Sequence, residues 1–278
     1  MQILTFSFYC DTLLLVELEI LLTVCAFAIG LLVGFTGVGA GALMTPLLIV
    51  GFGISPAVAI ATDLLYASVT KTVGGLAHLR HGGVQWSILR RLWIGGLIGV
   101  GVGVASVFFV VGTEFEGEAL RIPLAVVILL AAASLISRST RSREPVSAQE
   151  SESEPSRSAL TIGGGTGIGL AVSLTSVGAG ALGMALLTRV SPRGTAPAAL
   201  VGTDLLFAVP IAMVAGVSYF VGGLVELALL ANLLVGSLPG VVLGSLMSGK
   251  APARLLNFLI GLALVVAAVM TVSSVFAS

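Results

Sequence analysis

Val38-Gly39-Ala40-Gly41-Ala42-Leu43 occurs near the start of the chain and returns, with every residue kept, as Val177-Gly178-Ala179-Gly180-Ala181-Leu182. A second stretch, Thr62-Asp63-Leu64-Leu65, returns as Thr203-Asp204-Leu205-Leu206. Two separate motifs repeated in the same order indicate that the chain is a duplicated unit.

A third repeated feature consists of glycines at every fourth position, at the same distance after each aspartate. They are Gly95, Gly99 and Gly103 in the first half and Gly236, Gly240 and Gly244 in the second half. This spacing lets two helices approach closely. In an apolar chain, glycine-interrupted segments at matching places in two halves are typical of transporters whose substrate site lies where the halves meet.

The composition places this chain in a lipid bilayer. It is 57% hydrophobic and 9% charged over 278 residues, with a formal net charge of zero, and its mean hydropathy is +1.14. Apolar runs long enough to cross about 30 Å of hydrocarbon recur along the chain. We therefore expect an all-α polytopic membrane protein. The neutral balance gives no indication of a nucleic-acid partner.

Three regions follow from the distribution of charge. Residues 138–158 carry clustered arginines and glutamates among serines and prolines, which is typical of a solvated linker. We expect a first membrane repeat at 1–137, a cytoplasmic linker at 138–158 and a second membrane repeat at 159–278.

Each half is predicted to begin with a helical hairpin broken by glycines, followed by three transmembrane helices. Ser55-Pro56 is typical of a helix start, with proline at the first helical position. The expected segments are Leu18 to Phe35, Ala42 to Val50, Pro56 to Leu79, Leu92 to Val111 and Arg121 to Ile136, then Leu160 to Leu174, Ala181 to Leu187, Pro192 or Pro197 to Phe220, Glu226 to Met247 and Leu255 to Val275.

Basic residues in the connections predict opposite orientations for the two halves. The loop after the Asp63 helix contains Arg80, Arg90 and Arg91 and is expected in the cytoplasm, whereas the turn at 221–223 after the Asp204 helix is expected outside. The repeats are then inverted, with both termini outside. Each half crosses five times, or three times with a re-entrant hairpin, because the second arm of each hairpin is short for a full crossing.

The glycine breaks are candidate anion sites. Non-helical backbone at membrane depth persists only where it is buried in protein or lines a cavity, and the start of a helix offers free N–H groups to an anion. The candidate substrate-binding residues of the breaks are Thr36, Gly37, Gly39 and Gly41 in the first half and Thr175, Ser176, Gly178 and Gly180 in the second half. The alternative is that these glycines only permit close helix packing.

Three charged residues fall within predicted membrane helices. Asp63 and Asp204 are either proton carriers or supports that accept hydrogen bonds from a neighbouring helix end. Lys71 has the apolar Ala212 as its counterpart in the second half. It is either an anion-attracting group or an interfacial lysine whose side chain snorkels to the membrane surface.

The sequence suggests no cofactor, metal site or enzyme chemistry. His78 and His81 are expected where a helix leaves the membrane, and Cys10 and Cys25 are expected to be packing residues. Neither glycine break ends in the Gly-Lys-Ser/Thr of a phosphate loop. Transport energy is therefore expected to come from a gradient.

These residues resemble the TauE/SafE family of sulfite exporters, which are membrane transporters of sulfur-containing anions. The likeness lies in Gly30-xxx-Gly34-Phe35-Thr36-Gly37-Val38-Gly39-Ala40-Gly41, in Pro46 after it, and in the second copy that ends at Thr203-Asp204. The second copy has Ala185 at the place of Pro46. The resemblance implies a substrate such as sulfite, sulfoacetate or another organosulfonate.

The hypothesis from sequence is a secondary transporter in the cytoplasmic membrane that moves a small sulfur-containing anion by alternating access, coupled to protons. Two alternatives remain: a passive anion channel that uses the same helix ends as a filter, and a membrane assembly partner without transport activity. The anion, the direction of transport, the coupling ion and the oligomeric state are left open by the residues.

Overall fold

A computed structural model describes residues 2–36, 41–79, 84–111, 154–192 and 194–247, with the single positions 126, 129, 130, 133 and 265. These residues form helices and no β-strand. In chain order the elements are α1 (Gln2–Thr36), α2 (Gly41–Pro46), the π-helical turn η1 (Leu47–Gly51), α3 (Pro56–Leu79), α4 (Trp86–Ser106), the π-helical turn η2 (Val107–Val111), α6 (Glu154–Thr175), α7 (Ala181–Val190), α8 (Pro197–Val221) and α9 (Leu227–Met247).

The prediction of an all-α membrane protein is confirmed. Within the described ranges, five helices are long and apolar enough to cross a membrane, judged by length and composition: Glu17–Gly34, Trp86–Phe109, Arg157–Thr175, Ala199–Val221 and Leu227–Leu246. The 24-residue α3 is not among them, and it carries Asp63 and Lys71. The ten residues of α7 span roughly 15 Å, about half of the hydrocarbon thickness.

Most predicted helix boundaries lie close to the observed ones. The helix α3 begins at Pro56, and α8 begins at Pro197 rather than Pro192. The largest difference is α1, which starts at Gln2 instead of near Leu18, because glutamates such as Glu17 interrupt an apolar run without interrupting a helix.

The second difference concerns the predicted linker, 138–158. Its last residues are helical because α6 begins at Glu154, where an acidic residue followed by Pro155 suits the first turn of a helix. The rest of the linker, and most of the helices expected at 121–136 and 255–275, lie outside the described residues.

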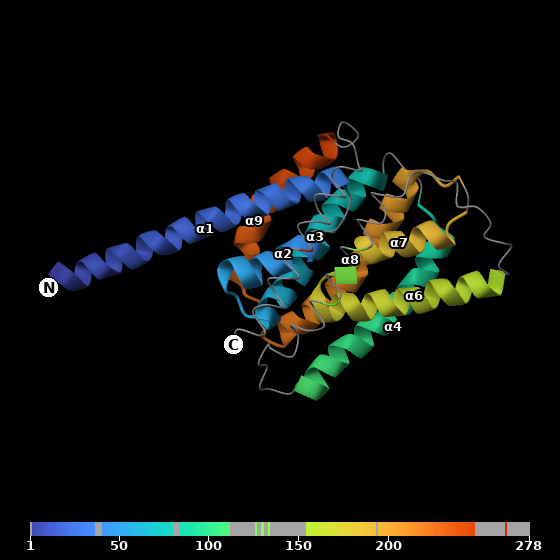
Figure 1. Cartoon of the computed structure of the whole chain (residues 1–278), viewed down its shortest axis with the longest axis horizontal. Coiled ribbons are helices and arrows are strands. Elements are labelled where there is room, and N and C mark those ends of the chain that lie inside the picture. Colours follow the sequence, from blue (N-terminus) through green and yellow to red (C-terminus); the bar gives the residue numbers. More distant parts are fainter. Residues whose placement is uncertain are drawn as a thin grey trace.

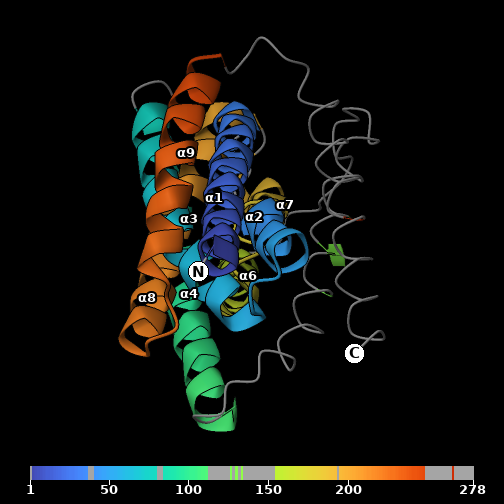
Figure 2. The same ribbon diagram turned by 90° about the vertical axis from the view of Figure 1, so that its left-hand side faces the viewer.

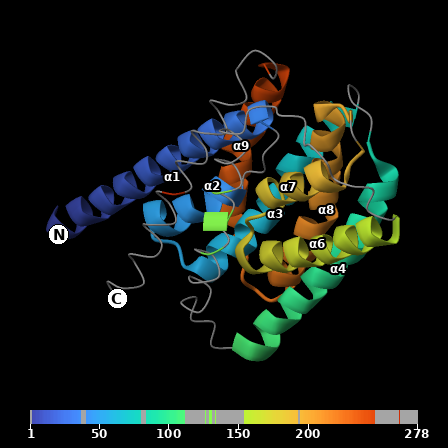
Figure 3. The same ribbon diagram turned by 45° about the vertical axis from the view of Figure 1, so that its right-hand side comes forward.

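Two long helix pairs connect the halves, and glycines set how closely each pair packs. Figures 1 and 3 show α1 beside α9 and α4 beside α6. A side-chain carbon at Gly99 of α4 would overlap the carbonyl oxygen of Thr166 in α6, and one at Gly240 of α9 would overlap that of Phe27 in α1. The predicted glycine rows are therefore helix-packing surfaces.

The two pairs use corresponding positions of the two halves. Gly95 meets Ile162 just as Gly236 meets Thr23. In each pair, the helix that precedes one glycine break packs on the helix that follows the aspartate helix of the other half. Neither half therefore buries its glycine row by itself.

The helices α3 and α8, which carry the two aspartates, pair along their lengths. Gly75 of α3 lies against Leu205 and Leu206 of α8, while Gly216 of α8 lies against Leu65 of α3. An early residue of each helix thus meets a late residue of the other, so the two helices run antiparallel.

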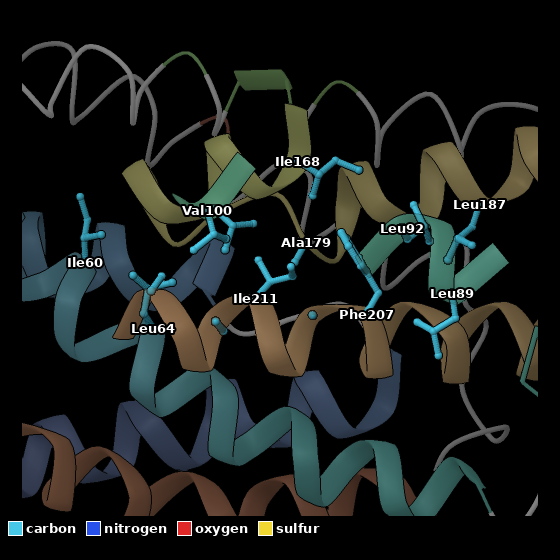
Figure 4. Packing of buried hydrophobic residues seen from close by; sticks show 14 of the residues in the cluster. Ile60, Leu64, Leu89, Leu92, Val100, Ile168, Ala179, Leu187, Phe207 and Ile211 are labelled. Carbon is cyan, nitrogen blue, oxygen red and sulfur yellow. The ribbon is translucent and has the colours of Figure 1, made fainter. Parts of the chain in front are cut away.

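The apolar core forms two clusters, each built from both halves. One contains residues of α1, α2, η1 and α9, including Met44 and Leu233. The other, shown in Figure 4, contains residues of α4, α6, α7 and α8, including Leu92 and Phe207. Figure 2 looks nearly along α1 and shows α2, α6 and α7 on one side of it and α3, α8 and α9 on the other. The helix α3 contributes to both clusters.

The packing at Gly99 can be tested against a matched glycine on the same helix. Replacing Gly99 by Ala forces α4 away from the backbone of α6 and should lower the free energy of unfolding by about 1–3 kcal/mol. Gly101 has no atom within 4 Å of the added carbon, so the Gly101→Ala variant should match or slightly exceed the wild type. Thermal melts in detergent measure both, and equal melting temperatures would contradict the α4–α6 contact.

Candidate functional site

Asp63 lies in the interior at the meeting point of three segments. Its carboxylate belongs to α3, and the Thr45 hydroxyl of α2 donates to its Oδ2 atom at 2.5 Å. The Ser176 hydroxyl, from the glycine break of the other half, lies close enough to interact with the same carboxylate but without hydrogen-bond geometry. Asp63 Oδ1 has no hydrogen-bond partner among the described residues. A first-half carboxylate therefore faces a second-half break.

The backbone at Ser176 is strained. Its φ of 59° is the left-handed conformation, which costs a residue with a Cβ about 1–2 kcal/mol. The position that corresponds to it in the first half is Gly37, which lies outside the described residues. The buried Ser176 hydroxyl has no partner among the described residues. Such strain at a buried, unsatisfied polar group is typical of functional sites.

Asp204 occupies the corresponding place on α8. Its carboxylate packs on Gly183 in the first turn of α7, where an added side-chain carbon would overlap Oδ1. Thr45 stands in α2, the short helix of the first half, as Gly183 stands in α7. Each aspartate thus lies beside the short helix of its own half, as the sequence predicted for residues close to the breaks.

Lys71 is buried between the two aspartates. Its exposed fraction is 3%, against 0% for Asp63 and 2% for Asp204. Its charge interacts with Asp204 most strongly and then with Asp63. Because Leu65 faces Gly216 and Gly75 faces Leu206, Lys71 lies near the midpoint of the antiparallel α3–α8 pair. The interfacial alternative for Lys71 does not hold, since its side chain is enclosed.

The second glycine break is only partly satisfied by its own hydrogen bonds. The Thr175 hydroxyl donates to the Ala171 carbonyl at 2.6 Å and accepts from the Val177 amide at 3.2 Å. The amides of Leu182 and Gly183 donate to the Gly178 carbonyl. No hydrogen bond from the preceding amides, those of Gly178, Ala179 and Gly180, is found within the described residues. These three amides are the donors that the predicted anion site requires.

The first break is described only at its edges. Thr36 ends α1 and Gly41 begins α2. Gly37 and Gly39 lie outside the described residues, so the site predicted for this half stays a prediction.

Two threonines of the repeated Thr-Asp motif connect the halves, and sequence reasoning missed them. The Thr203 hydroxyl accepts from the Gln85 amide at the start of α4 at 3.1 Å, and the Thr62 hydroxyl accepts from the Glu226 amide at the start of α9 at 3.2 Å. The Gln85 side chain also donates to Thr195 at 2.7 Å. The sequence did contain a signal for this contact, because Thr62 and Thr203 occupy matching positions of the repeat, and so do Gln85 and Glu226.

These contacts lie at opposite ends of the α3–α8 pair. Thr62 and Asp63 stand near the start of α3, and Thr203 and Asp204 stand near the start of α8, which runs the other way. Each end therefore has one threonine that holds the first turn of a helix from the other half. In the structure both contacts are formed and all three charged side chains are buried.

Substitution of Thr203 tests this end contact. Valine keeps the shape but removes the acceptor, leaving the Gln85 amide unpaired, and should destabilise the fold by about 1–3 kcal/mol. Thr72, whose hydroxyl only donates to Ser68 of its own helix on an exposed face, provides the control. The Thr72→Val variant should melt within a degree or two of the wild type, and a Thr203→Val variant that did the same would rule out the contact.

The strain at Ser176 can be measured with two variants that both lack the hydroxyl. Alanine retains the left-handed cost, whereas glycine adopts this conformation freely. We expect Ser176→Gly to be more stable than Ser176→Ala by about 1 kcal/mol, as measured by chemical or thermal unfolding in detergent. The reverse order would mean that Ser176 is not left-handed.

Comparison with known proteins assigns the family. The family model described as "Sulfite exporter TauE/SafE" matches residues 22–271. The chain is 34% identical over 234 residues to the "Probable membrane transporter protein YjnA" of Bacillus subtilis (strain 168), covering 83% of this chain and 91% of the relative. It is 26% identical over 243 residues to YdhB of the same organism, another probable membrane transporter protein, covering 85% and 93%. No solved structure matches. A glycine-broken, all-helical membrane protein with buried charges at its centre, matched over nearly its whole length, therefore belongs to the TauE/SafE family of sulfite exporters, and it is a membrane transporter of that family.

Proposed function

We propose that this chain is a secondary transporter built from two inverted-topology repeats, which moves a small sulfur-containing anion across the cytoplasmic membrane by alternating access and is coupled to protons. The observation that carries the proposal is the buried Lys71 between Asp63 and Asp204, at the middle of the antiparallel α3–α8 pair.

Inverted repeats are supported by the direction of equivalent helices. The helices α3 and α8 bear the same Thr-Asp motif and run antiparallel. Two halves related by an axis along the membrane normal would place equivalent helices parallel, whereas an axis in the membrane plane reverses them. The basic connections then favour a cytoplasmic linker at 138–158 and both termini outside.

Alternating access is supported by the two matched end contacts. Thr62 with Glu226, and Thr203 with Gln85, are the same contact made once at each end of the α3–α8 pair. Because the halves are built alike, opening one end or the other exchanges two states of similar free energy, which is what a carrier needs. The buried charges favour a carrier over an open channel, which would keep them in contact with water.

The anion is inferred from charge and from the family. Lys71 is the only buried cation among the described residues. The Ser176 hydroxyl lies near Asp63, and the amides of Gly178 to Gly180 are further uncharged donors in the same break. Together they suit an oxyanion such as sulfite or an organosulfonate. In a protein that only packed against partners, three charged groups inside the membrane would be a cost without a function, which weighs against the assembly role.

Asp63 and Asp204 are the proposed proton carriers. In proteoliposomes with an imposed proton gradient, Asp63→Asn and Asp204→Asn should each slow sulfite uptake at least tenfold, because one of the two carboxylates that relay the proton is lost. Unchanged gradient-driven transport by both variants would remove the carrier role.

Lys71 is the proposed anion anchor, and Arg189, exposed on α7, provides a matched cationic control. Lys71→Met should abolish the rise in melting temperature that sulfite gives to the purified protein, since binding to the folded state is what raises it. Arg189→Met should keep that rise. Equal stabilisation of the two variants by sulfite would place the anion elsewhere.

A further inference from the structure

Buried hydroxyl groups from both halves gather on the Asp63 side of the interior. Besides Ser176, which lies beside the Asp63 carboxylate, they include Tyr66, three residues after Asp63 on the same face of α3. The Tyr66 hydroxyl lies close to that of Ser237 in α9, but without hydrogen-bond geometry, and the charge of Asp63 acts on it. Tyr66 also packs in one apolar cluster with Val177, the neighbour of Ser176. These side chains therefore form one polar group, which we call the Asp63 hydroxyl group: Asp63, Tyr66, Ser176 and Ser237.

Four oxygen atoms of the Asp63 hydroxyl group have no hydrogen-bond partner among the described residues. They are the hydroxyl oxygens of Tyr66, Ser176 and Ser237 and the Oδ1 atom of Asp63. All four residues are at least 97% buried, because their exposed fractions are 0% or 3%. A buried polar atom without a partner costs free energy. Four such atoms on neighbouring side chains therefore indicate a place for a ligand that forms hydrogen bonds.

The second half keeps the shape of this place but not its hydroxyls. A side-chain carbon added at Gly96 would overlap the ring of Phe207, so Phe207 lies against Gly96 as Tyr66 lies against Ser237. Figure 4 shows Phe207 among apolar side chains of the second cluster. The four residues whose hydroxyls lie on the Asp63 side all have counterparts without a hydroxyl, and these are Met184 for Thr45, Gly37 for Ser176, Phe207 for Tyr66 and Gly96 for Ser237.

The Asp63 hydroxyl group suits an oxyanion. Each of its three hydroxyls can donate one hydrogen bond, and a protonated carboxyl group donates another. Thr45 donates to Oδ2 of Asp63, so the acid proton belongs on the unpartnered Oδ1. The positive charge of Lys71, which interacts with Asp63, favours an anion over a metal cation at this place.

We propose that the oxyanion group of the substrate binds on the Asp63 side, where it accepts hydrogen bonds from the hydroxyls of Tyr66, Ser176 and Ser237 and from the protonated carboxyl group of Asp63. The inference rests on the proposed function and adds Tyr66 and Ser237 to the substrate site. Only one of the two matching places in the duplicated chain then holds the oxyanion.

This placement brings the anion and the proton together. An ionised Asp63 repels the oxyanion, whereas the protonated carboxyl group donates to it. Asp63 takes its proton from water on the side where the substrate enters and returns it to water on the side where the substrate leaves. Anion and proton therefore bind together and leave together.

Tyr66→Phe tests the new contact, and Tyr219→Phe is its matched control. Without substrate, the Tyr66→Phe protein should melt at or above the wild-type temperature, because the hydroxyl that it loses has no partner. Its affinity for sulfite, obtained from the rise in melting temperature with sulfite concentration, should be roughly tenfold weaker or more. The Tyr219 hydroxyl donates to the Ser173 carbonyl at 2.9 Å. The Tyr219→Phe variant should therefore melt lower and keep the wild-type affinity.

Ser237→Ala tests the second new contact in the same way. The variant should melt near the wild type without substrate and should bind sulfite roughly tenfold more weakly or worse. Ser173 provides the control, because it is also fully buried and its hydroxyl donates to the Leu170 carbonyl of its own helix at 2.9 Å. The Ser173→Ala variant should keep the affinity for sulfite.

Asp63→Asn separates binding from coupling. The asparagine amide accepts from Thr45 through its oxygen and donates through its nitrogen, as the protonated carboxyl group does. Sulfite should therefore stabilise this variant about as much as the wild type, although its gradient-driven uptake is slowed. Loss of the stabilisation would overturn the role of the protonated carboxyl group as a donor.

The outcomes also separate this inference from the proposed function. Wild-type affinity for sulfite in both Tyr66→Phe and Ser237→Ala would place the oxyanion elsewhere while leaving an anion transporter. A lower melting temperature of the empty Tyr66→Phe protein would show that this hydroxyl serves the fold, which also contradicts the inference. Absence of sulfite binding and of sulfite flux in the wild-type protein would overturn the proposed function itself.

Discussion

Hydrocarbon offers no partner to a charge or to an open backbone amide, so such groups have to be enclosed by protein, and here the two halves of the chain enclose them together. The pairing of α3 with α8 meets this constraint. It places two aspartates and one lysine in a shared interior where neither half alone would cover them. The glycine rows have the same dependence, because each row of one half packs on the first helix of the other.

This exchange of contacts explains why the same residues recur in both halves. Thr62 caps a helix of the second half and Thr203 caps a helix of the first. Both aspartates lie beside a short helix that starts after a glycine break. A residue that serves one end of the molecule has its copy at the other end, so the duplication supplies two ends that are held by the same contact. A single half would have only one.

Much of this was readable from the sequence, because the signals were local or repeated. The glycine breaks, the helix start at Pro56 and the intramembrane aspartates follow from spacing and residue type alone. The position of the Lys71 side chain could not be predicted from spacing and residue type. A lysine near the middle of a helix reaches either the interface or the interior, and only the packing of α8 decides which of the two it reaches. The left-handed backbone conformation of Ser176 could not be predicted either, because the counterpart of Ser176 is a glycine and no neighbouring residue indicates strain.

The two halves differ at one charged position in the interior. Each half supplies an aspartate, but only the first supplies a lysine, and Ala212 stands at the matching place in the second. The charge of Lys71 interacts with both aspartates, and its side chain lies near the midpoint of the antiparallel α3–α8 pair. One lysine at this place therefore serves both ends of the molecule. The threonine contacts and the aspartates, in contrast, stand toward the ends of the pair, and each end has its own copy.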